Sequence, residues 1–223
     1  MKKKEKQFPR VSVIIPLFNH EKFIGRCLRS LLSQTLDKNE FEIIIVDDCS
    51  KDNSLKALNP YKNHIKIIKN KKNLGLPSSL NKGIELSKGS FVVRVDSDDW
   101  VDREYLRILY LHLKINNNLD AVSCDYNVVD ESQNYLRSCN SEKHPIGCGI
   151  MFRIEHLIDI GAYDGKLRMH EEVDLTIRFL KKFKIYRVPL SLYRYRQHLN
   201  NLSKQSTMKK SFLIKLKKKH INK

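Results

Sequence analysis

The sequence predicts a single α/β domain with a mainly parallel, mixed sheet flanked by helices. Over residues 11–116, apolar segments of strand length alternate with amphipathic helical segments. Three of these strands run directly into polar or acidic clusters. Hydrophobic residues make up 41% and charged residues 30% of 223 residues, which suits one core and excludes a disordered chain.

The first half of the chain predicts strands and helices in strict alternation. The predicted strands cover residues 11–15, 42–46, 65–69 and 91–95. The predicted helices cover residues 21–34, 77–87 and 102–116, with a further helix start at 50–54. Their apolar residues recur at spacings of three and four, as on one face of a helix. We expect Ser78 or a neighbour to cap the helix at 77–87 and Gly89 to close it.

The second half predicts a looser arrangement. Strands are predicted at 121–129, 134–139, 186–188 and 190–195, helices at 154–160 and 171–182, and a glycine-interrupted apolar run at 147–152. No repeat or linker separates the halves, so we expect one domain over residues 10–203. Residues 10–119 and 120–203 form its halves, between a basic tail at 1–9 and another at 204–223.

The net charge of +17 lies mostly in the tails. Residues 1–10 carry +4 and residues 203–223 carry +8, which leaves +5 for residues 11–202. A nucleic-acid-binding module is the alternative that the charge suggests, but the polar clusters of the domain are acidic and we expect no nucleic acid. The C-terminal tail is either a solvated charge run or, over residues 211–223, a basic amphipathic segment for an anionic membrane surface.

Sequence features favour a cytoplasmic protein. No apolar run approaches the roughly 20 residues that span a bilayer, and we expect no cleavable leader. The five cysteines contain no C-x-x-C pair, so we expect neither a disulfide framework nor a zinc ribbon.

Three polar clusters follow predicted strands, at residues 16–19, at Asp47 and Asp48, and at residues 96–99. Ligands of such sheets bind beyond the carboxyl ends of the strands, where these clusters would meet. Three carboxylates within residues 96–99 repel one another unless a cation neutralises them, and oxygen ligands suit Mg²⁺ or Mn²⁺. The alternative is an acidic turn in which Asp99 or Asp102 caps the next helix.

Several motifs occur in one order along the chain: VSVIIPLFN at 11–19, IVDDCS at 45–50, NLG at 73–75, NKG at 81–83 and VDSDDW at 95–100. Together they resemble the family-2 inverting glycosyltransferases of GT-A fold. EEVDLTIR at 171–178, YRQH at 195–198 and Ser203 are similar to downstream motifs of that family. The resemblance covers roughly residues 10–203.

The resemblance implies a nucleotide-sugar donor, with UDP-sugar favoured, held with Mn²⁺ or Mg²⁺. It implies a glycan or lipid-linked acceptor in cell-surface polysaccharide synthesis. The basic C-terminus, rather than the resemblance, suggests peripheral contact with the inner face of a membrane. Implied donor-binding residues are Pro16, Leu17, Phe18, Asn19, Glu21, Asp47, Asp48, Asn73, Asn81, Arg94, Asp96, Ser97 and Arg196. Implied metal-binding residues are Asp96, Asp98, Asp99 and His198.

Individual donor-side roles also come from the resemblance. Asp48 would accept the N–H of a pyrimidine, and Asp96 would lie near the ribose, with Asp98 or Asp99 at the metal. Phe18 would face the base, the alternative being ordinary core packing. Leu80 stands where many members carry a phosphate-binding arginine. We therefore expect Arg94 to supply that charge to the diphosphate or to stabilise the acid cluster.

On the acceptor side, Glu172 occupies the position of the catalytic base, with Glu171 as the alternative base and Asp174 beside them. The competing interpretation is an acidic helix start with an Asp174–Arg178 ion pair. His198 would approach the metal or phosphates, or else lie on the surface. Residues expected in the acceptor region are Trp100, Gly147, Cys148 and Gly149. The glycines would let the backbone approach a sugar, and Cys148 is not expected to be a nucleophile.

Overall fold

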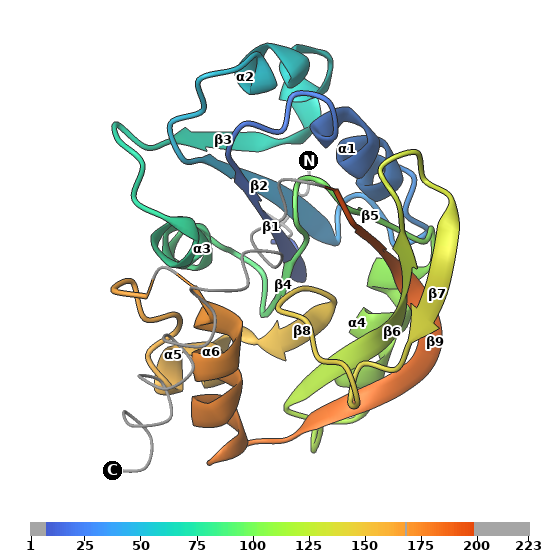
Figure 1. Ribbon diagram of the computed structural model, residues 1–223. Coiled ribbons are helices and arrows are strands. Elements are labelled where there is room, and N and C mark those ends of the chain that lie inside the picture. Colours follow the sequence, from blue (N-terminus) through green and yellow to red (C-terminus); the bar gives the residue numbers. More distant parts are fainter. Residues whose placement is uncertain (1–7, 168, 199–223) are drawn as a thin grey trace, which may run out of the picture.

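The computed structural model describes residues 8–167 and 169–198 (Figure 1). Within them one mixed nine-stranded sheet runs in the order β3-β2-β1-β4-β8-β6-β9-β5, and β7 pairs with β6. The predictions for residues 1–7, for Ser203 and for the C-terminal tail at 204–223 lie outside the described residues. No helix in the described ranges is long and apolar enough to cross a bilayer.

The first half forms the parallel part of the sheet. Its strands are β1 (Val11–Leu17), β2 (Phe41–Asp47), β3 (Lys66–Lys69) and β4 (Phe91–Arg94), and all their pairings are parallel. Its helices are α1 (Ile24–Leu32), α2 (Ser54–Ala57), η1 (Asn59–His64), α3 (Leu76–Glu85) and α4 (Tyr105–Ile115). Since parallel strands share one carboxyl edge, the loops after β1, β2 and β4 meet there.

The second half adds the mixed part. Its strands are β5 (Trp100–Val101), β6 (Ala121–Val129), β7 (Tyr135–Cys139), β8 (Ile150–Arg153) and β9 (Ile185–Arg196), and its helices are α5 (Ile154–Asp159) and α6 (Glu171–Leu180). β8 joins the halves by pairing antiparallel with both β4 and β6, whereas β6 and β9 are parallel. The two halves therefore share one sheet.

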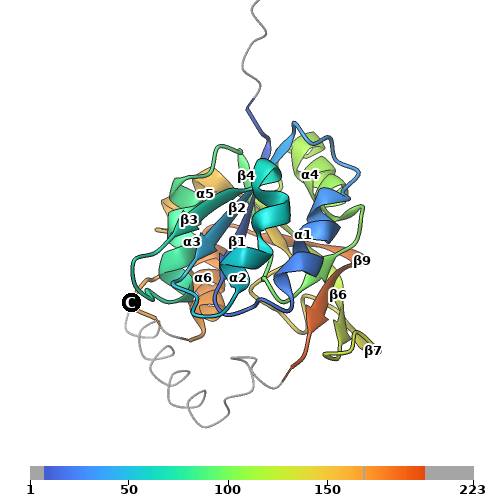
Figure 2. The same cartoon turned by 90° about the horizontal axis from the view of Figure 1, so that it is seen from above.

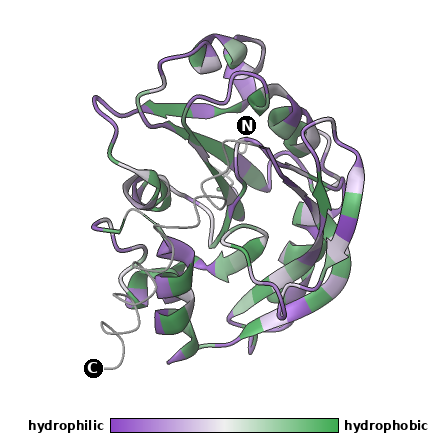
Figure 3. Cartoon of the chain, in the orientation of Figure 1, coloured by the Kyte–Doolittle hydropathy of each residue, from purple (hydrophilic) through white to green (hydrophobic). Residues whose placement is uncertain are grey.

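Helices cover both faces of the sheet, with α1 and α4 on one side and α3, α5 and α6 on the other (Figure 2). Successive residues of β1 alternate between these layers, Val13 facing α1 and α4 and Ile14 facing α3. The central strands are accordingly hydrophobic on both faces (Figure 3). α3 lies so close to β1 that a Cβ on Gly83 would stand 2.5 Å from Ile14.

The structure corrects three local predictions. α3 begins one residue before Pro77 with Gly75 (φ 88°) at its N-cap, so Ser78 lies inside the helix. α3 ends at Glu85, and Gly89 does not close it. The two strands predicted on either side of Pro189 are one strand, β9, because an irregularity in the β6–β9 register leaves Pro189 unpaired with β6.

Candidate active site

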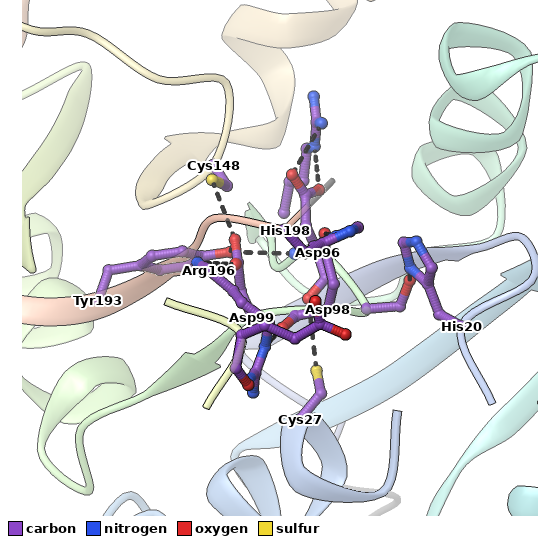
Figure 4. A network of polar contacts seen from close by, with 12 residues as sticks. His20, Cys27, Asp96, Asp98, Asp99, Cys148, Tyr193, Arg196 and His198 are labelled. Carbon is purple, nitrogen blue, oxygen red and sulfur yellow. Dashed lines mark hydrogen bonds and ion pairs between the residues drawn. The ribbon is translucent and has the colours of Figure 1, made fainter. Parts of the chain in front are cut away.

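The three predicted polar clusters do meet at the carboxyl edge of the sheet. Leu17 O accepts the backbone N–H of Asp48 at 2.8 Å, and Nδ1 of His20 lies 2.7 Å from Oγ of Ser97. These contacts join the loop after β1 to the loops after β2 and β4. Figure 4 shows the acidic segment at 96–99 together with His20 and His198. One compact polar site results from segments far apart in the sequence.

Asp98 and two histidines form the most ligand-like cluster of this edge. Oδ2 of Asp98 lies 2.8 Å from Nε2 of His198, and one donor atom from each of His20, Asp98 and His198 lies within 4.8 Å of the others (Figure 4). The side chain of His198 is only 5% exposed. The interpretation of His198 as a surface residue is therefore wrong.

The surroundings of Asp98 favour its charged form. Burial opposes ionisation, but the hydrogen bond to His198 and the electrostatic interactions with His20 and His198 outweigh it and lower the pKa of Asp98. An ionised carboxylate beside imidazole nitrogens is a suitable ligand set for a divalent cation. The residues present therefore fit the ion that the resemblance implies.

Asp99 is used differently from its neighbour. Its Oδ1 accepts the backbone N–H of Arg196 at 2.7 Å and its Oδ2 accepts the hydroxyl of Tyr193 at 2.8 Å. Burial, followed by the negative charges of Asp98 and Asp96, raises the pKa of Asp99 well above its usual value. Asp99 thus anchors β9 beneath the acidic segment. It neither caps α4 nor offers its oxygens to the open side, which leaves Asp98 as the better metal ligand.

Arg94 connects the acidic segment to α6. Its Nε and Nη2 lie 2.6 and 3.0 Å from the two carboxylate oxygens of Asp96, and its Nη1 lies 3.1 Å from Oε1 of Glu171. Its side chain is 10% exposed. Of the two roles expected for Arg94, the geometry favours stabilising the acid cluster, since the guanidinium is engaged by carboxylates. By pairing with Glu171 as well as Asp96, the arginine also holds the start of α6 at the carboxyl edge of the sheet.

Glu172 is the more accessible carboxylate of the Glu171–Glu172 pair. Its side chain is 31% exposed, against 7% for Glu171. Burial and the adjacent Glu171 raise the pKa of Glu172 to about 7. A carboxylate with this pKa can accept a proton near neutral pH. Gly147 lies against both partners of this arrangement, because a Cβ there would stand 2.8 Å from Arg94 and from Glu172.

Asp174 does not face the site. Its side chain is fully buried, and its Oδ2 accepts Nε of Arg178 at 2.8 Å. Arg178 in turn donates to the carbonyls of Ile160 and Ala162. The ion-pair interpretation describes this residue, and its inclusion among the catalytic acids is corrected. Asp174 fastens α6 to the segment after α5.

Some of the residues expected to bind the nucleotide are exposed, and others are hydrogen-bonded to other parts of the chain. Phe18 is 43% exposed, so its interpretation as core packing is wrong. Asp48 accepts hydrogen bonds from the side chain of Asn70 and from the backbone of Leu74 and Gly75, at 2.8–2.9 Å. A carboxylate has about four acceptor positions, so about one remains for a ligand.

The other predicted donor residues mostly shape loops. Pro16 and Leu17 belong to β1, and the backbone of Asn19 adopts φ 55°. Glu21 accepts the N–H of Asn53, and Asp47 accepts the N–H of Ser50. The amide of Asn81 pairs with both backbone groups of Tyr163, and Asn73 lies exposed after β3.

Arg196 and the predicted acceptor residues are also largely structural. The guanidinium of Arg196 donates to the carbonyls of Asp98 and Glu131 and lies 4.6 Å from the ring centroid of Trp100. Cys148 is 2% exposed, and burial raises the pKa of its thiol well above its usual value. Gly147 packs against protein side chains, and Gly149 adopts φ 77°. Gly147 thus serves close packing within the chain, whereas Gly149 serves a left-handed backbone conformation.

Sequence reasoning missed His20 and Tyr193. His20 directly follows the first polar cluster, and its place at the carboxyl edge was a usable signal. Tyr193 offered no signal, since its hydroxyl reaches Asp99 across 94 residues of sequence.

Comparisons with known proteins agree with this geometry. The chain matches the family described as Glycosyl transferase family 2 over residues 12–174, and it belongs to that family. The predicted family and GT-A fold are confirmed. This chain is 40% identical over 113 residues to a poly(ribitol-phosphate) beta-glucosyltransferase of Bacillus spizizenii, and the match covers 49% of this chain and 18% of that protein.

Two solved structures extend the comparison. A fragment of Staphylococcus aureus TarS in complex with UDP-GlcNAc superposes with a TM-score of 0.77 at 25% identity, covering 88% of this chain and 61% of that one. The mannosyltransferase PcManGT of Pyrobaculum calidifontis, in complex with GDP-Man and Mn²⁺, superposes with a TM-score of 0.77 and covers 97% of this chain and 65% of that one. At 17% identity, this likeness shows the fold alone. The chain spans less than two thirds of each of these relatives.

Proposed function

We propose that this chain is an inverting glycosyltransferase that moves a sugar from a UDP-sugar to a glycan or lipid-linked acceptor in cell-surface polysaccharide synthesis. The observation that carries the proposal is that Arg94 pairs with both Asp96 of the acidic segment and Glu171, which brings the Glu171–Glu172 pair to the segment that holds Asp98. Family membership supports it. A nucleic-acid-binding role finds no support, because the site is acidic and the relatives compared above are glycosyltransferases.

Asp98 and His198 are proposed to hold Mn²⁺ or Mg²⁺. Such an ion, when bound, supplies positive charge that stabilises a diphosphate leaving group. Asp96 stays paired with Arg94 and is directed by it, next to the expected ribose position. The exposed ring of Phe18 offers a surface for the base. Uracil is favoured because TarS, a 25% identical structural relative, is described in complex with UDP and with UDP-GlcNAc.

Glu172 is proposed as the general base. It takes the proton of the acceptor hydroxyl while that oxygen forms its bond to the anomeric carbon and the bond from this carbon to the diphosphate breaks. One displacement inverts the configuration and needs no covalent intermediate with the protein. The ion pair of Arg94 with Glu171 holds the start of α6 in place, so Glu172 points its carboxylate from a fixed helix.

The acceptor and the place of reaction are proposals from the sequence. The basic tail at 204–223 is proposed to hold a cytoplasmic enzyme at the inner face of the membrane. Deleting this tail should move the protein from the membrane fraction to the supernatant, while leaving nucleotide binding unchanged. An unchanged distribution would remove the membrane part of the proposal.

Thermal shift and calorimetry with UDP, GDP, CDP and dTDP, each with and without Mn²⁺, test the donor side. We expect UDP with Mn²⁺ to raise the melting temperature most, and Asp98→Asn to remove the part that depends on Mn²⁺. Asp159→Asn, at an exposed ion pair on α5, is the matched control. If no nucleoside diphosphate binds, the proposed function is wrong.

A further inference from the structure

His20 lies in the candidate metal centre although no motif of the sequence assigns it there. It comes from the loop after β1, Asp98 from the loop after β4, and His198 from just beyond the end of β9 (Figure 4). One donor atom from each residue lies within 4.8 Å of the other two. Three ligand-type side chains thus gather from positions that are 78 or more residues apart in the sequence.

The orientation of the His20 ring is fixed by the protein. Nδ1 lies 2.7 Å from Oγ of Ser97, a residue that is 2% exposed, and the backbone N–H of His20 donates to Oγ of Ser54 at 2.9 Å. The ring meets those of Phe23 and His198 edge to face, with centroids 5.9 and 6.0 Å apart. When Nδ1 carries the proton and donates to Ser97, Nε2 is left as a lone-pair donor. The described residues offer Nε2 no hydrogen-bond partner.

This arrangement is that of a metal-binding histidine. Such histidines use one ring nitrogen as ligand and hold the other in a hydrogen bond that sets tautomer and ring direction. Ser97 supplies that bond to His20 from inside the acidic segment itself. The same segment carries Asp98, so the orienting group and the carboxylate ligand move together.

We propose that His20 is a third protein ligand of the cation, and that the resulting His20–Asp98–His198 set selects a first-row transition ion such as Mn²⁺ over Mg²⁺. Imidazole nitrogen binds first-row transition ions, with Mn²⁺ the weakest of them, whereas Mg²⁺ prefers oxygen ligands and retains its waters, so the preference over Mg²⁺ holds for the whole transition series. Three protein ligands also allow the ion to bind before the nucleotide. The proposal rests on the proposed function only in naming the ion that a diphosphate would later meet.

The competing role for His20 is a direct contact with a diphosphate oxygen. The two roles differ in the absence of nucleotide: a ligand affects binding of the metal alone, whereas a phosphate contact affects only binding of the nucleotide. Metal binding by the full chain without nucleotide therefore separates them.

The first experiment measures Mn²⁺ and Mg²⁺ binding to the chelator-treated full chain by calorimetry, without nucleotide. We expect Mn²⁺ to bind at least about tenfold more tightly than Mg²⁺, and His20→Ala to weaken Mn²⁺ binding by about 10–100-fold while changing Mg²⁺ binding less. His64→Ala, an exposed histidine on η1, is the matched control and should bind both ions as the unaltered chain does. Equal Mn²⁺ affinity of His20→Ala and the unaltered chain would overturn the proposal.

A second measurement needs no variant and covers the case in which His20→Ala does not fold. Pulsed electron paramagnetic resonance of the Mn²⁺-loaded chain detects nitrogen coupled to the ion. Two imidazoles are expected to give a combination signal that one imidazole does not, and a single coupled nitrogen would contradict the proposal. If UDP with Mn²⁺ binds normally while Mn²⁺ alone does not, the inference fails and the proposed function stands. If Mn²⁺ alone binds through His20 but no nucleotide binds, the inference about His20 stands and the proposed function fails.

Discussion

Two pairs of adjacent acids stand at the carboxyl edge, Asp98–Asp99 after β4 and Glu171–Glu172 at the start of α6. In each pair, one acid contacts a basic side chain, His198 for Asp98 and Arg94 for Glu171. In each pair, burial together with a neighbouring charge raises the pKa of the other acid. Adjacent carboxylates thus divide into a member that is paired with a basic side chain and a member whose pKa is raised.

The two acids with raised pKa values, Asp99 and Glu172, differ in solvent access. Asp99 is 2% exposed, and its oxygens are occupied by Tyr193 and Arg196, whereas the side chain of Glu172 is 31% exposed. The same direction of pKa shift therefore supports packing in one region and proton transfer in the other. A raised pKa marks a candidate base only where a substrate can reach the carboxylate.

The largest effect is expected from substitutions that separate the roles of Glu171 and Glu172. Glu172→Gln should lower kcat by about 10²–10⁴-fold, because the amide cannot accept the proton of the acceptor hydroxyl. Glu171→Gln should retain more of the rate and lose stability, since it removes a partner of Arg94. Release of UDP from the best-binding donor measures kcat, and urea unfolding measures stability. The opposite ranking of the two rates would assign the base to Glu171.

The next effect concerns the cation that joins the two regions. Arg94→Met should lower the free energy of unfolding by about 3 kcal/mol, because Asp96 and Glu171 keep their charges in poorly hydrated positions. Arg107→Met, at an exposed ion pair with Glu104, is the control and should cost under about 1 kcal/mol. Urea unfolding compares them, and equal losses would show that Arg94 has no special place in the site.

The parallel half of the fold follows from local sequence. β1, β2 and β4 were predicted within two residues at each end, since β-branched apolar runs and polar strand ends lie within single segments. β5 was missed because its two residues become a strand only by pairing with β9. The predicted break at Pro189 is wrong, because the sequence does not show that a register irregularity can accommodate this proline within one strand.

The candidate site divides in the same way. The acidic segment and the Glu171–Glu172 pair were recognisable as motifs, but their division of roles was not. Which of Asp98 and Asp99 faces outward depends on Tyr193 and on the backbone of Arg196, nearly 100 residues away. The place of His20 likewise depends on Ser97. Such roles come from long-range contacts that spacing alone does not encode.

A third prediction concerns pH and the accessible acid. Below a pH of about 7, Glu172 becomes protonated and loses its ability to act as a base, so kcat should fall about tenfold per pH unit. Above that pH, Glu172 is ionised and the rate should level off. The residual activity of Glu172→Gln should lack this limb. A limb that survives the substitution unchanged would place the titrating group elsewhere.

The smallest expected effect concerns the enclosed acid. Asp99→Asn should change the free energy of unfolding by less than about 1 kcal/mol at pH 5, because the amide oxygen can still accept the N–H of Arg196. Asp99→Ala leaves that N–H and the Tyr193 hydroxyl without this acceptor, and should cost about 1–3 kcal/mol.

The pH dependence of Asp99→Asn sharpens this test. The pKa of Asp99 is higher in the folded than in the unfolded protein, so its contribution to stability is complete below the unfolded-state pKa of about 3.9 and is lost as the pH rises toward the folded-state value. The asparagine variant has no such loss. Its free energy of unfolding, measured in urea, should therefore rise relative to that of the unaltered chain from pH 5 to pH 8. If the free energy of unfolding of the variant instead falls relative to the unaltered chain as the pH rises, the folded protein holds Asp99 in its charged form. The comparison of Asp99 with Glu172 as two acids of raised pKa would then be wrong.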